Sequence, residues 1–588
     1  MNQILPEKPI SPVGPRRLVP RPALRLAGGR VGGWSLLSLA IALVLALPVV
    51  VVFGAVFIPA GEVWDHLSAT VLPRYLENTF VLAGGVGVGT MIVGTGTAWL
   101  VTMYRFPGQR WLEWGLLLPM AVPAYVLAYT YTGMLDYAGP VQSALREVFG
   151  WGRRDYWFPE IRSLGGAVAM LVLVLYPYVY LLARAAFLEQ SVCVLEASRT
   201  LGCSRWQSFW RVAVPLARPA IATGVALALM EALADFGTVQ YFAVDTFTTG
   251  IYRTWLGLGD PAAAAQLAAM LMAFVFMLVL LERSSRRGAR FHHTTSRYRP
   301  LPRITLSRWA GILAMTACFL PPFLGLFLPG SQLILWLMET YATHIDREFL
   351  SLAWNSVSLA AITAALAVAF ALILAYGVRL RPSIIGRFAN RLASMGYAIP
   401  GSVIAVGVLV PFSWADNMLD DWARDQFGIS TGLLLSGTLV ALVFAYLVRF
   451  LAVSLNTVEA SMAKVTPNMD AAGRSLGKSA LQVVLQVHSP IMRGSLLTAA
   501  LLVFVDVLKE LPATLIMRPF NFNTLAVRAF ELASDEQLRE SAAASLTIIG
   551  VAILPVILLS LSIAHSRPGK SQDRSRGELK QQAGHEAS

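Results

Sequence analysis

The chain has 588 residues, of which 56% are hydrophobic and only 14% are charged, and its formal net charge is +13. A soluble globular domain carries about a quarter charged residues, so this composition excludes an ordinary soluble protein and indicates the membrane class. The positive charge alone would suit a nucleic-acid partner. It is concentrated in short segments between apolar stretches, however, and nucleic acid is therefore excluded as a partner.

About twelve apolar stretches are long enough to span a bilayer, which needs about 20 residues of helix. The first six lie near residues 34–58, 79–103, 114–135, 164–182, 215–234 and 262–281. The second six lie near residues 309–328, 356–378, 392–410, 432–448, 490–507 and 542–561. Because lipid cannot satisfy backbone hydrogen bonds, these stretches are expected to be helices. The sequence predicts an all-α membrane protein with about 12 transmembrane helices.

The charged segments divide the chain and predict its orientation. Residues 283–308 contain eight arginines and no acidic residue, whereas the loop between the ninth and tenth stretches carries Asp416 and Asp420. Basic loops stay in the cytoplasm, so both termini are predicted to be cytoplasmic. The resulting domains are a cytoplasmic disordered tail, a first membrane domain, a basic cytoplasmic linker, a second membrane domain and a cytoplasmic tail. They cover residues 1–33, 34–282, 283–308, 309–565 and 566–588.

One segment occurs twice, in the middle of each membrane domain. Residues 195–202 read LEASRTLG and residues 470–477 read DAAGRSLG, with a proline thirteen residues after each final glycine. A shift of 275 positions superposes the two copies, and it also places Glu231 on Asp506 and Asp235 on Glu510. Such a shift indicates internal duplication. Each half has an even number of spans, so the halves share orientation as parallel repeats.

Each copy of this segment is predicted to form a helix–turn–helix on the cytoplasmic side. Gly202 and Gly477 suit a turn with positive φ, and Pro215 and Pro490 suit the start of a span because their missing N–H costs little there. An ordinary amphipathic connector explains one such loop, but it does not explain two copies in register. Two copies indicate a docking element that meets a duplicated soluble partner.

The loop resembles the EAA loop of binding-protein-dependent ABC importer permeases, in which it forms the coupling helix that contacts the ATPase subunit. The resemblance gives this role to Glu196, Ala197, Gly202 and Pro215 in the first half. In the second half it gives the role to Asp470, Ala472, Gly477 and Pro490. The second copy departs from the pattern, because Ala471 stands at the position of Glu196 and the acid comes one residue earlier.

The segments after the fifth and eleventh spans, residues 231–255 and 505–528, resemble the fused two-domain permeases of bacterial iron(III) ABC importers. This resemblance implies a type I ABC importer permease with two six-helix halves in the bacterial inner membrane. It also implies two copies of an ATPase subunit on the cytoplasmic face and a periplasmic iron-binding protein. The chain itself is expected to bind no cofactor, and ATP is expected to be used by the partner ATPase.

A segment in the second loop is similar to a nucleotide-binding motif. Residues 473–479 read GRSLGKS, which places three residues between the glycines where a phosphate-binding loop needs four. No preceding soluble strand is expected either. The chain is therefore predicted not to be an enzyme.

Four acids at the ends of the fifth and eleventh spans are candidate pathway residues: Glu231, Asp235, Asp506 and Glu510. Charge at such depth is costly and often lines a polar pathway, and carboxylates suit a hard cation. A purely structural role is equally open, for example an ion pair between Lys509 and Glu510. No cluster of His, Tyr and carboxylate residues marks a tight ferric site.

Three alternatives remain open from the sequence. An ABC importer permease of the same architecture could carry polyamine, thiamine, sulfate or phosphonate. An ion-gradient-driven secondary transporter would give no reason for duplicated docking loops. A membrane scaffold without transport is the third alternative.

Overall fold

The computed structural model describes residues 33–59, 61–152, 154–189, 198, 200–286, 303–380 and 382–565. Within the first sequence half the elements are α1 Gly33–Gly54, η1 Ala55–Phe57, α2 Glu62–Thr70, α3 Leu72–Met103, β1 Tyr104–Arg105, α4 Gln109–Gly115, η2 Leu118–Ala121, α5 Ala124–Leu135, α6 Pro140–Phe149, α7 Leu164–Glu189, α9 Arg205–Ser208, η3 Phe209–Ala213, α10 Val214–Ala234, α11 Gly237–Tyr241, α12 Phe247–Tyr252, η4 Arg253–Gly257 and α13 Pro261–Arg286.

The second sequence half repeats much of this order. Its elements are β2 Ile304–Thr305, α14 Arg308–Pro322, η5 Phe323–Phe327, α15 Leu328–His344, α16 Arg347–Leu380, α17 Ile384–Ala393, η6 Gly396–Ala398, α18 Gly401–Phe427, α19 Leu439–Met462, α20 Pro467–Ser475, α21 Ala480–Val483, η7 Val484–His488, α22 Ser489–Leu508, α23 Pro512–Met517, α24 Leu525–Ser534 and α25 Ala542–His565. The two short strands β1 and β2 pair in parallel.

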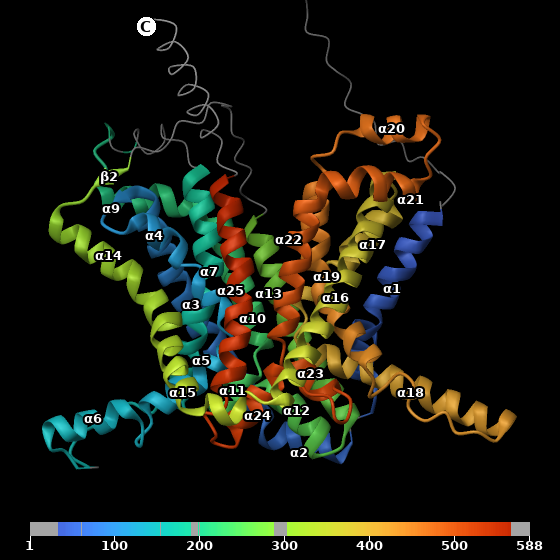
Figure 1. Ribbon diagram of the computed structural model, residues 1–588, viewed down its shortest axis with the longest axis horizontal. Helices are drawn as coiled ribbons and strands as arrows, with labels where there is room; N and C mark the ends of the chain where they lie inside the picture. Colours follow the sequence, from blue (N-terminus) through green and yellow to red (C-terminus); the bar gives the residue numbers. More distant parts are fainter. Residues whose placement is uncertain are drawn as a thin grey trace, which may run out of the picture.

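The predicted all-α membrane architecture is confirmed. Within the described part of the chain, ten helices are long and apolar enough to cross a membrane. The segments Gln109–Ala121 and Ala124–Phe149 form a pair bent by 93°, which brings the number of spans to 11 when the pair is counted as one broken span. The shorter apolar helix Ala542–Ile557 corresponds to the predicted twelfth. The long helices run side by side in one bundle (Figure 1).

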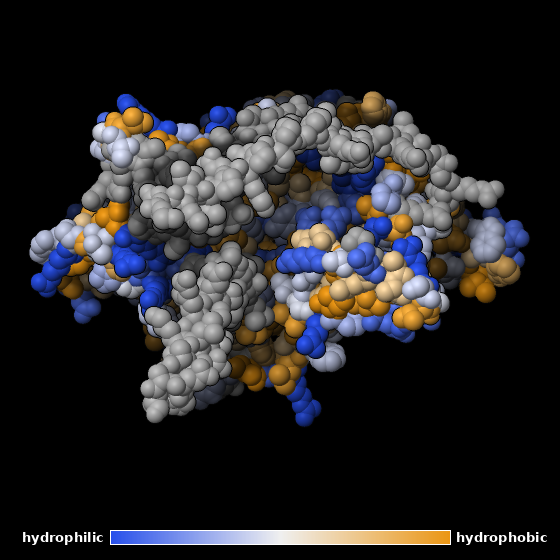
Figure 2. Space-filling view, turned by 90° about the horizontal axis from the view of Figure 1, so that it is seen from above, coloured by the Kyte–Doolittle hydropathy of each residue, from blue (hydrophilic) through white to orange (hydrophobic). Residues whose placement is uncertain are grey.

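The two ends of the bundle differ (Figure 1). We call the end that carries α9 and α20 the loop face. The opposite end carries α6 and the distal part of α18, which project sideways, and we call it the arm face. Seen onto the loop face, hydrophilic side chains lie among hydrophobic ones (Figure 2).

The third and ninth predicted spans are broken rather than continuous. In both, a proline follows a short 3-10 turn, and the residue before it is extended: Val122 has ψ 123° before Pro123, and Ile399 has ψ 126° before Pro400. A proline ring excludes the helical conformation from the residue that precedes it. The spans predicted near 114–135 and 392–410 are therefore each interrupted, and the break has the same cause in both halves.

Pseudo-symmetry extends to side-chain contacts. Asn78 of α3 donates from Nδ2 to the carbonyl of Asp245 at 2.8 Å, and Asn355 of α16 donates to the carbonyl of Asn523 at 3.3 Å. In each half this bond ties the second long helix to the segment after the fifth span. The duplication read from the sequence is therefore present in the tertiary structure.

The first helix of each half crosses to the other half. Helix α1 contacts α16, α17 and α18, while α14 and α15 contact α3, α4 and α5. Trp34 of α1 meets the ring of Tyr376 edge-on at 5.7 Å, and a Cβ built at Gly407 of α18 would lie 2.6 Å from the carbonyl oxygen of Pro48. The sequence halves thus interlock.

Glycines of α3 allow it to approach α7 closely. A Cβ at Gly85 or Gly89 would meet Val168 or Val172, and one at Gly94 would lie 2.9 Å from the backbone oxygen of Tyr176. Small residues permit such close packing of membrane helices. The glycine-rich second span is therefore a packing surface.

We expect Gly94→Val to weaken the bundle, because the neighbouring backbone of α7 cannot move aside as a flexible side chain could. Overpacking of this kind costs about 1–3 kcal/mol. The thermal unfolding midpoint of the purified protein should fall accordingly. The matched control is Gly96→Val on the same helix, where a Cβ meets nothing within 4 Å. Equal midpoints for the two variants would contradict the packing role.

Candidate functional site

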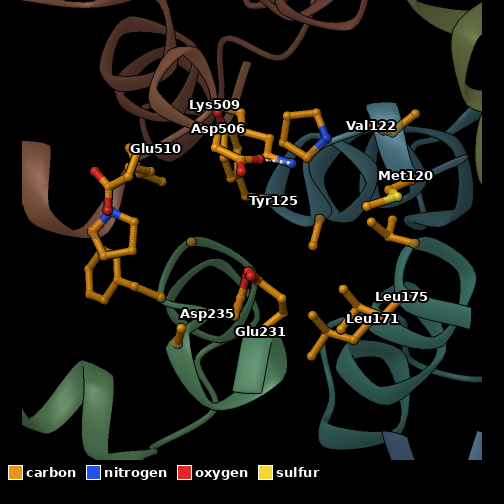
Figure 3. Close-up of a pocket in the computed structure, with 18 of the residues that line it drawn as sticks. Met120, Val122, Tyr125, Leu171, Leu175, Glu231, Asp235, Asp506, Lys509 and Glu510 are labelled. Carbon is orange, nitrogen blue, oxygen red and sulfur yellow. Dashed lines mark ion pairs between the residues drawn. The ribbon is translucent and has the colours of Figure 1, made fainter. Parts of the chain in front are cut away.

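A polar cavity lies between the two halves, at the ends of α10 and α22 (Figure 3). Its empty volume is about 770 Å³, part of which is open to solvent. The lining comes from η2, α5, α7, α10 and α11 of the first half and from α19 and α22 of the second. The lining residues that carry charge are Glu231, Asp235, Arg449, Asp506, Lys509 and Glu510.

The structure brings the four predicted pathway acids to this one cavity. Glu231 and Asp506, which the 275-residue shift relates, lie on α10 and α22 and remain partly exposed. Asp506 pairs with Lys509 one turn later on the same helix, with 3.0 Å between Oδ1 and Nζ (Figure 3). The suggested ion pair between Lys509 and Glu510 is not the one that forms.

Asp235 and Glu510 cap the short helices that follow them. Asp235 Oδ2 accepts from the backbone N–H of Thr238 and Val239 at 3.1 and 3.2 Å. Glu510 accepts from the backbone N–H of Ala513 and Thr514 at 3.0 and 3.1 Å. A carboxylate at a helix N-terminus satisfies N–H groups that have no partner within the helix. These two acids therefore have a structural role in both halves, although they line the cavity.

Arg449 of α19 joins the halves. Its guanidinium lies 3.0 Å from Glu510 and 3.8 Å from Glu231 of the first half. Arg449 and Glu510 are both buried, so each needs the other to offset the loss of hydration. The sequence analysis missed Arg449, which lies one residue beyond the predicted tenth span. The signal was a lone arginine inside an otherwise apolar run of the sequence.

The charged lining has an excess of acid. Four carboxylates face two cationic side chains, and both cations are engaged by carboxylates. Among the described residues, no group of three or more His, Cys, Asp or Glu side chains is arranged to hold a metal ion. The cavity therefore favours a cation by its field and offers no tight chelating site.

Apolar residues close the cavity where the halves meet. A Cβ at Gly237 would lie 2.7 Å from Tyr125 and 2.8 Å from Leu511 of the other half. Phe236 packs against Phe530 of α24 with ring centroids 5.9 Å apart. This layer joins α11 to the start of α23 and packs the two halves against each other.

The second repeated loop forms α20 and a glycine turn on the loop face (Figure 1). Gly477 has φ +76° and Gly202 has φ +82°, so the positive φ predicted for both glycines is confirmed. Before each glycine stands an exposed leucine, with Leu201 83% and Leu476 77% exposed. The two loops thus present the same apolar tip.

Asp470 fastens α20 to the bundle. Its Oδ2 accepts from Arg379 Nε at 2.7 Å, and its Oδ1 lies 2.5 Å from His488 Nε2. Arg379 also donates to the carbonyls of Met462 and Val465. Burial by itself would raise the pKa of Asp470, but the hydrogen bonds from His488 and Arg379 hold it below its ordinary value.

The position of this acid explains the departure from the EAA pattern. Asp470 is buried against the bundle, whereas Ala471, the equivalent of Glu196, is exposed, as is Ala472. Glu196 and Ala197 lie outside the described residues. In the first loop the hydroxyls of Ser198 and Ser208 meet at 2.9 Å, and this contact closes the turn from inside.

Pro215 and Pro490 are the second residues of α10 and α22, in agreement with their predicted place at the start of a span. Each α-helix is preceded by a π-helical turn, Phe209–Ala213 and Val484–His488. A proline lacks the N–H that an α-helical turn would use and crowds the carbonyl four residues earlier. Each proline thus has the same backbone irregularity before it.

Comparison with known proteins agrees with this geometry. Residues 90–289, which include the first repeated loop and α10, match the family of binding-protein-dependent transport system inner membrane components. The chain is therefore similar to this permease family over about a third of its length, all of it in the first sequence half.

Two of the similar proteins match this chain over most of its length. The Fe(3+)-transport system permease protein FbpB 2 of Haemophilus influenzae is 29% identical over 88% of this chain and 96% of its own length. The ferric transport system permease protein FbpB of Actinobacillus pleuropneumoniae is 23% identical over 92% of this chain and 79% of its own length. The sulfate transport system permease protein CysT of Escherichia coli is 28% identical, and 93% of it fits on 45% of this chain. Almost a whole permease thus aligns with less than half of this chain, as expected for two fused units.

We expect Asp470→Asn to loosen α20, because Arg379 and His488 then lose their ionic partner. The cost is about 2 kcal/mol, since Arg379 keeps its two carbonyl contacts. Amide hydrogen exchange over residues 467–477 should become faster, while Asp425→Asn in exposed α18 serves as the control. Unchanged exchange would contradict the anchoring role. Because the pKa of Asp470 is lowered, the wild-type contact is present at neutral pH and is lost only as the pH falls below about 4.

Proposed function

We propose that this permease is the membrane subunit of an ATP-driven ABC importer for iron(III), which a periplasmic binding protein delivers. The observation that carries this proposal is the acid-rich cavity between two halves that each bear the same docking loop. The proteins similar to this chain over most of its length are named as ferric permeases, whereas the sulfate permease matches only half of it.

The charge of the cavity favours a cation as cargo. Four carboxylates against two cations attract Fe³⁺ and repel sulfate, phosphonate or molybdate. Carboxylate oxygens are also ligands that hard cations prefer. Because no chelating cluster holds the ion, recognition falls to the binding protein, and the cavity supplies a transient passage.

The two loops support a duplicated ATPase on the loop face. Leu201 and Leu476 form exposed apolar tips at equivalent positions, and α20 is held rigidly to the bundle through Asp470. In the proposed cycle, ATP draws two ATPase subunits together and the loops move with them. The halves then separate at the Arg449–Glu231 contact and at the layer around Gly237. ATP belongs to the partner, and this chain supplies no cofactor site.

The cargo is tested by measuring uptake of labelled iron(III) in iron-starved cells. Uptake is compared between cells in which the gene is deleted and cells in which it is restored. Loss and recovery of ATP-dependent uptake would support iron. Unchanged iron uptake in cells without a second iron importer would contradict iron as the cargo. The similarity to permeases would remain, and the cargo would be another solute. Sulfate uptake measured in the same cells is the specific alternative, given the sulfate permease relative.

We expect Asp506→Asn to lower iron uptake roughly tenfold, because losing one attractive charge raises the barrier by about 1.4 kcal/mol. The double variant Asp506→Asn with Lys509→Gln leaves three carboxylates and one cation in the lining. Its excess of two negative charges equals that of the wild type, so we expect it to recover most of the uptake. Recovery would show that net charge matters rather than the single ion pair. If Asp506→Asn transports normally, the pathway role of this acid is wrong.

We expect Gly477→Val to uncouple ATP hydrolysis from transport, because a β-branched residue is strained at φ +76° and reshapes the docking tip. Gly477→Asn is the matched control, since asparagine tolerates this conformation. The measurements are copurification of the ATPase, ATPase rate and uptake in vesicles. Normal uptake by the valine variant, present at wild-type amount in the membrane, would count against docking at this loop.

A further inference from the structure

Two helical arms project sideways from the arm face, at opposite ends of the long axis of the molecule (Figure 1). The first is α6 with its return segment, residues 140–163. The second is the distal part of α18 with its return segment, residues 411–438. Each arm follows the broken span of its half, after Pro123 or Pro400. The duplicated position indicates that both arms serve one purpose.

The first arm uses its polar side for internal contacts. Gln142 donates from Nε2 to the carbonyl of Leu135 at 2.8 Å and accepts from the hydroxyl of Tyr156 at 2.7 Å. Arg146 donates to the same hydroxyl at 3.1 Å, and its guanidinium stacks 4.1 Å from the ring of Tyr137. The polar residues of α6 thus hold the return segment.

The apolar side of the first arm is left exposed. Val141, Leu145 and Val148 follow the spacing of one helix face; Val141 and Leu145 are half-buried, and Val148 toward the tip is 76% exposed. Trp157 of the return segment is also exposed. A surface helix in water has the opposite arrangement, with its apolar stripe toward the protein.

The second arm repeats this inverted arrangement. Asp416 accepts from the backbone N–H of Leu434, Leu435 and Ser436 at 3.1, 2.9 and 2.7 Å. Asp420 accepts from the N–H of Thr431 at 2.7 Å. The two acids thus bind the return segment of this arm to its helix.

The outward side of the second arm is an aromatic stripe. Trp414, Met418 and Trp422 are spaced four residues apart, so they lie along one side of α18, and Trp414 is 66% and Trp422 56% exposed. Leu433 and Leu434 of the return segment are exposed as well. Tryptophan concentrates where acyl chains meet head groups, because its ring is apolar and its N–H is polar.

We propose that both arms lie in the head-group region of the bilayer on the arm face and hold the permease at a fixed depth. The occupant of the apolar stripes is phospholipid, because the arms extend away from the bundle, where the neighbour of a membrane protein is lipid. Helices with one apolar side and one polar side bind such interfaces. The two arms brace the halves from opposite sides while the halves rock.

Spin labels test this placement in the full-length permease reconstituted in phosphatidylethanolamine–phosphatidylglycerol nanodiscs. In a background without the native cysteines, Val148→Cys and Met418→Cys place labels on the apolar stripes. Glu147→Cys and Asp421→Cys place labels at neighbouring exposed positions. Trp157→Cys and Trp422→Cys provide a second position in each arm, so the test does not depend on one variant.

The readout is the collision rate of each label with oxygen, which partitions into lipid, relative to a nickel chelate, which stays in water. We expect this ratio to be several-fold higher for the stripe labels than for the matched labels. Equal ratios in all positions would overturn the proposal and place the stripes in water. Shielding of the stripe labels that arises only after binding protein is added would overturn it in favour of a protein-docking surface.

Discussion

The fold depends on the need to pair every charge that the bundle buries. Arg449 is surrounded by helices of both halves and pairs with Glu510 beside it and Glu231 across the interface. Removing Arg449 or Glu510 leaves the other charge buried with too little hydration and too little compensation. The contact therefore holds the halves in one relative position and sets the polarity of the cavity they enclose.

Around this centre, duplicated backbone features shape each half in the same way. A proline breaks the third helix, a π-helical turn precedes the fifth, and a carboxylate caps the short helix after it. These features come from residue types that act locally, so duplication of the sequence duplicates them in the structure. The exchange of α1 and α14 between the halves adds a constraint, because each half remains tied to the other through these helices.

Some features are shared by the two halves and others are found in one half alone. The glycine turns and the exposed leucine tips are alike in the two loops. The cavity residues differ: Arg449 and Lys509 come from the second half, and the first half contributes only acids to the charged lining. The charged lining of the cavity is thus asymmetric, although the two repeated loops are alike.

The sequence by itself determined the features that depend on local pattern: the apolar helices, the duplication, the positive-φ glycines, and the candidate acids Glu231, Asp235, Asp506 and Glu510. It could not assign their roles, because Asp235 and Glu510 differ from Glu231 and Asp506 only in which groups the fold brings within reach. The pairing of Arg449 with Glu510 and Glu231, the partners of Asp470, the crossing of α1 and the inverted arms were decided by the tertiary structure alone. Each of these features depends on residues that are far apart in the chain, or on which side of a helix packs against the protein. The spacing of residues along one sequence gives neither the distance between such residues nor the orientation of the helix.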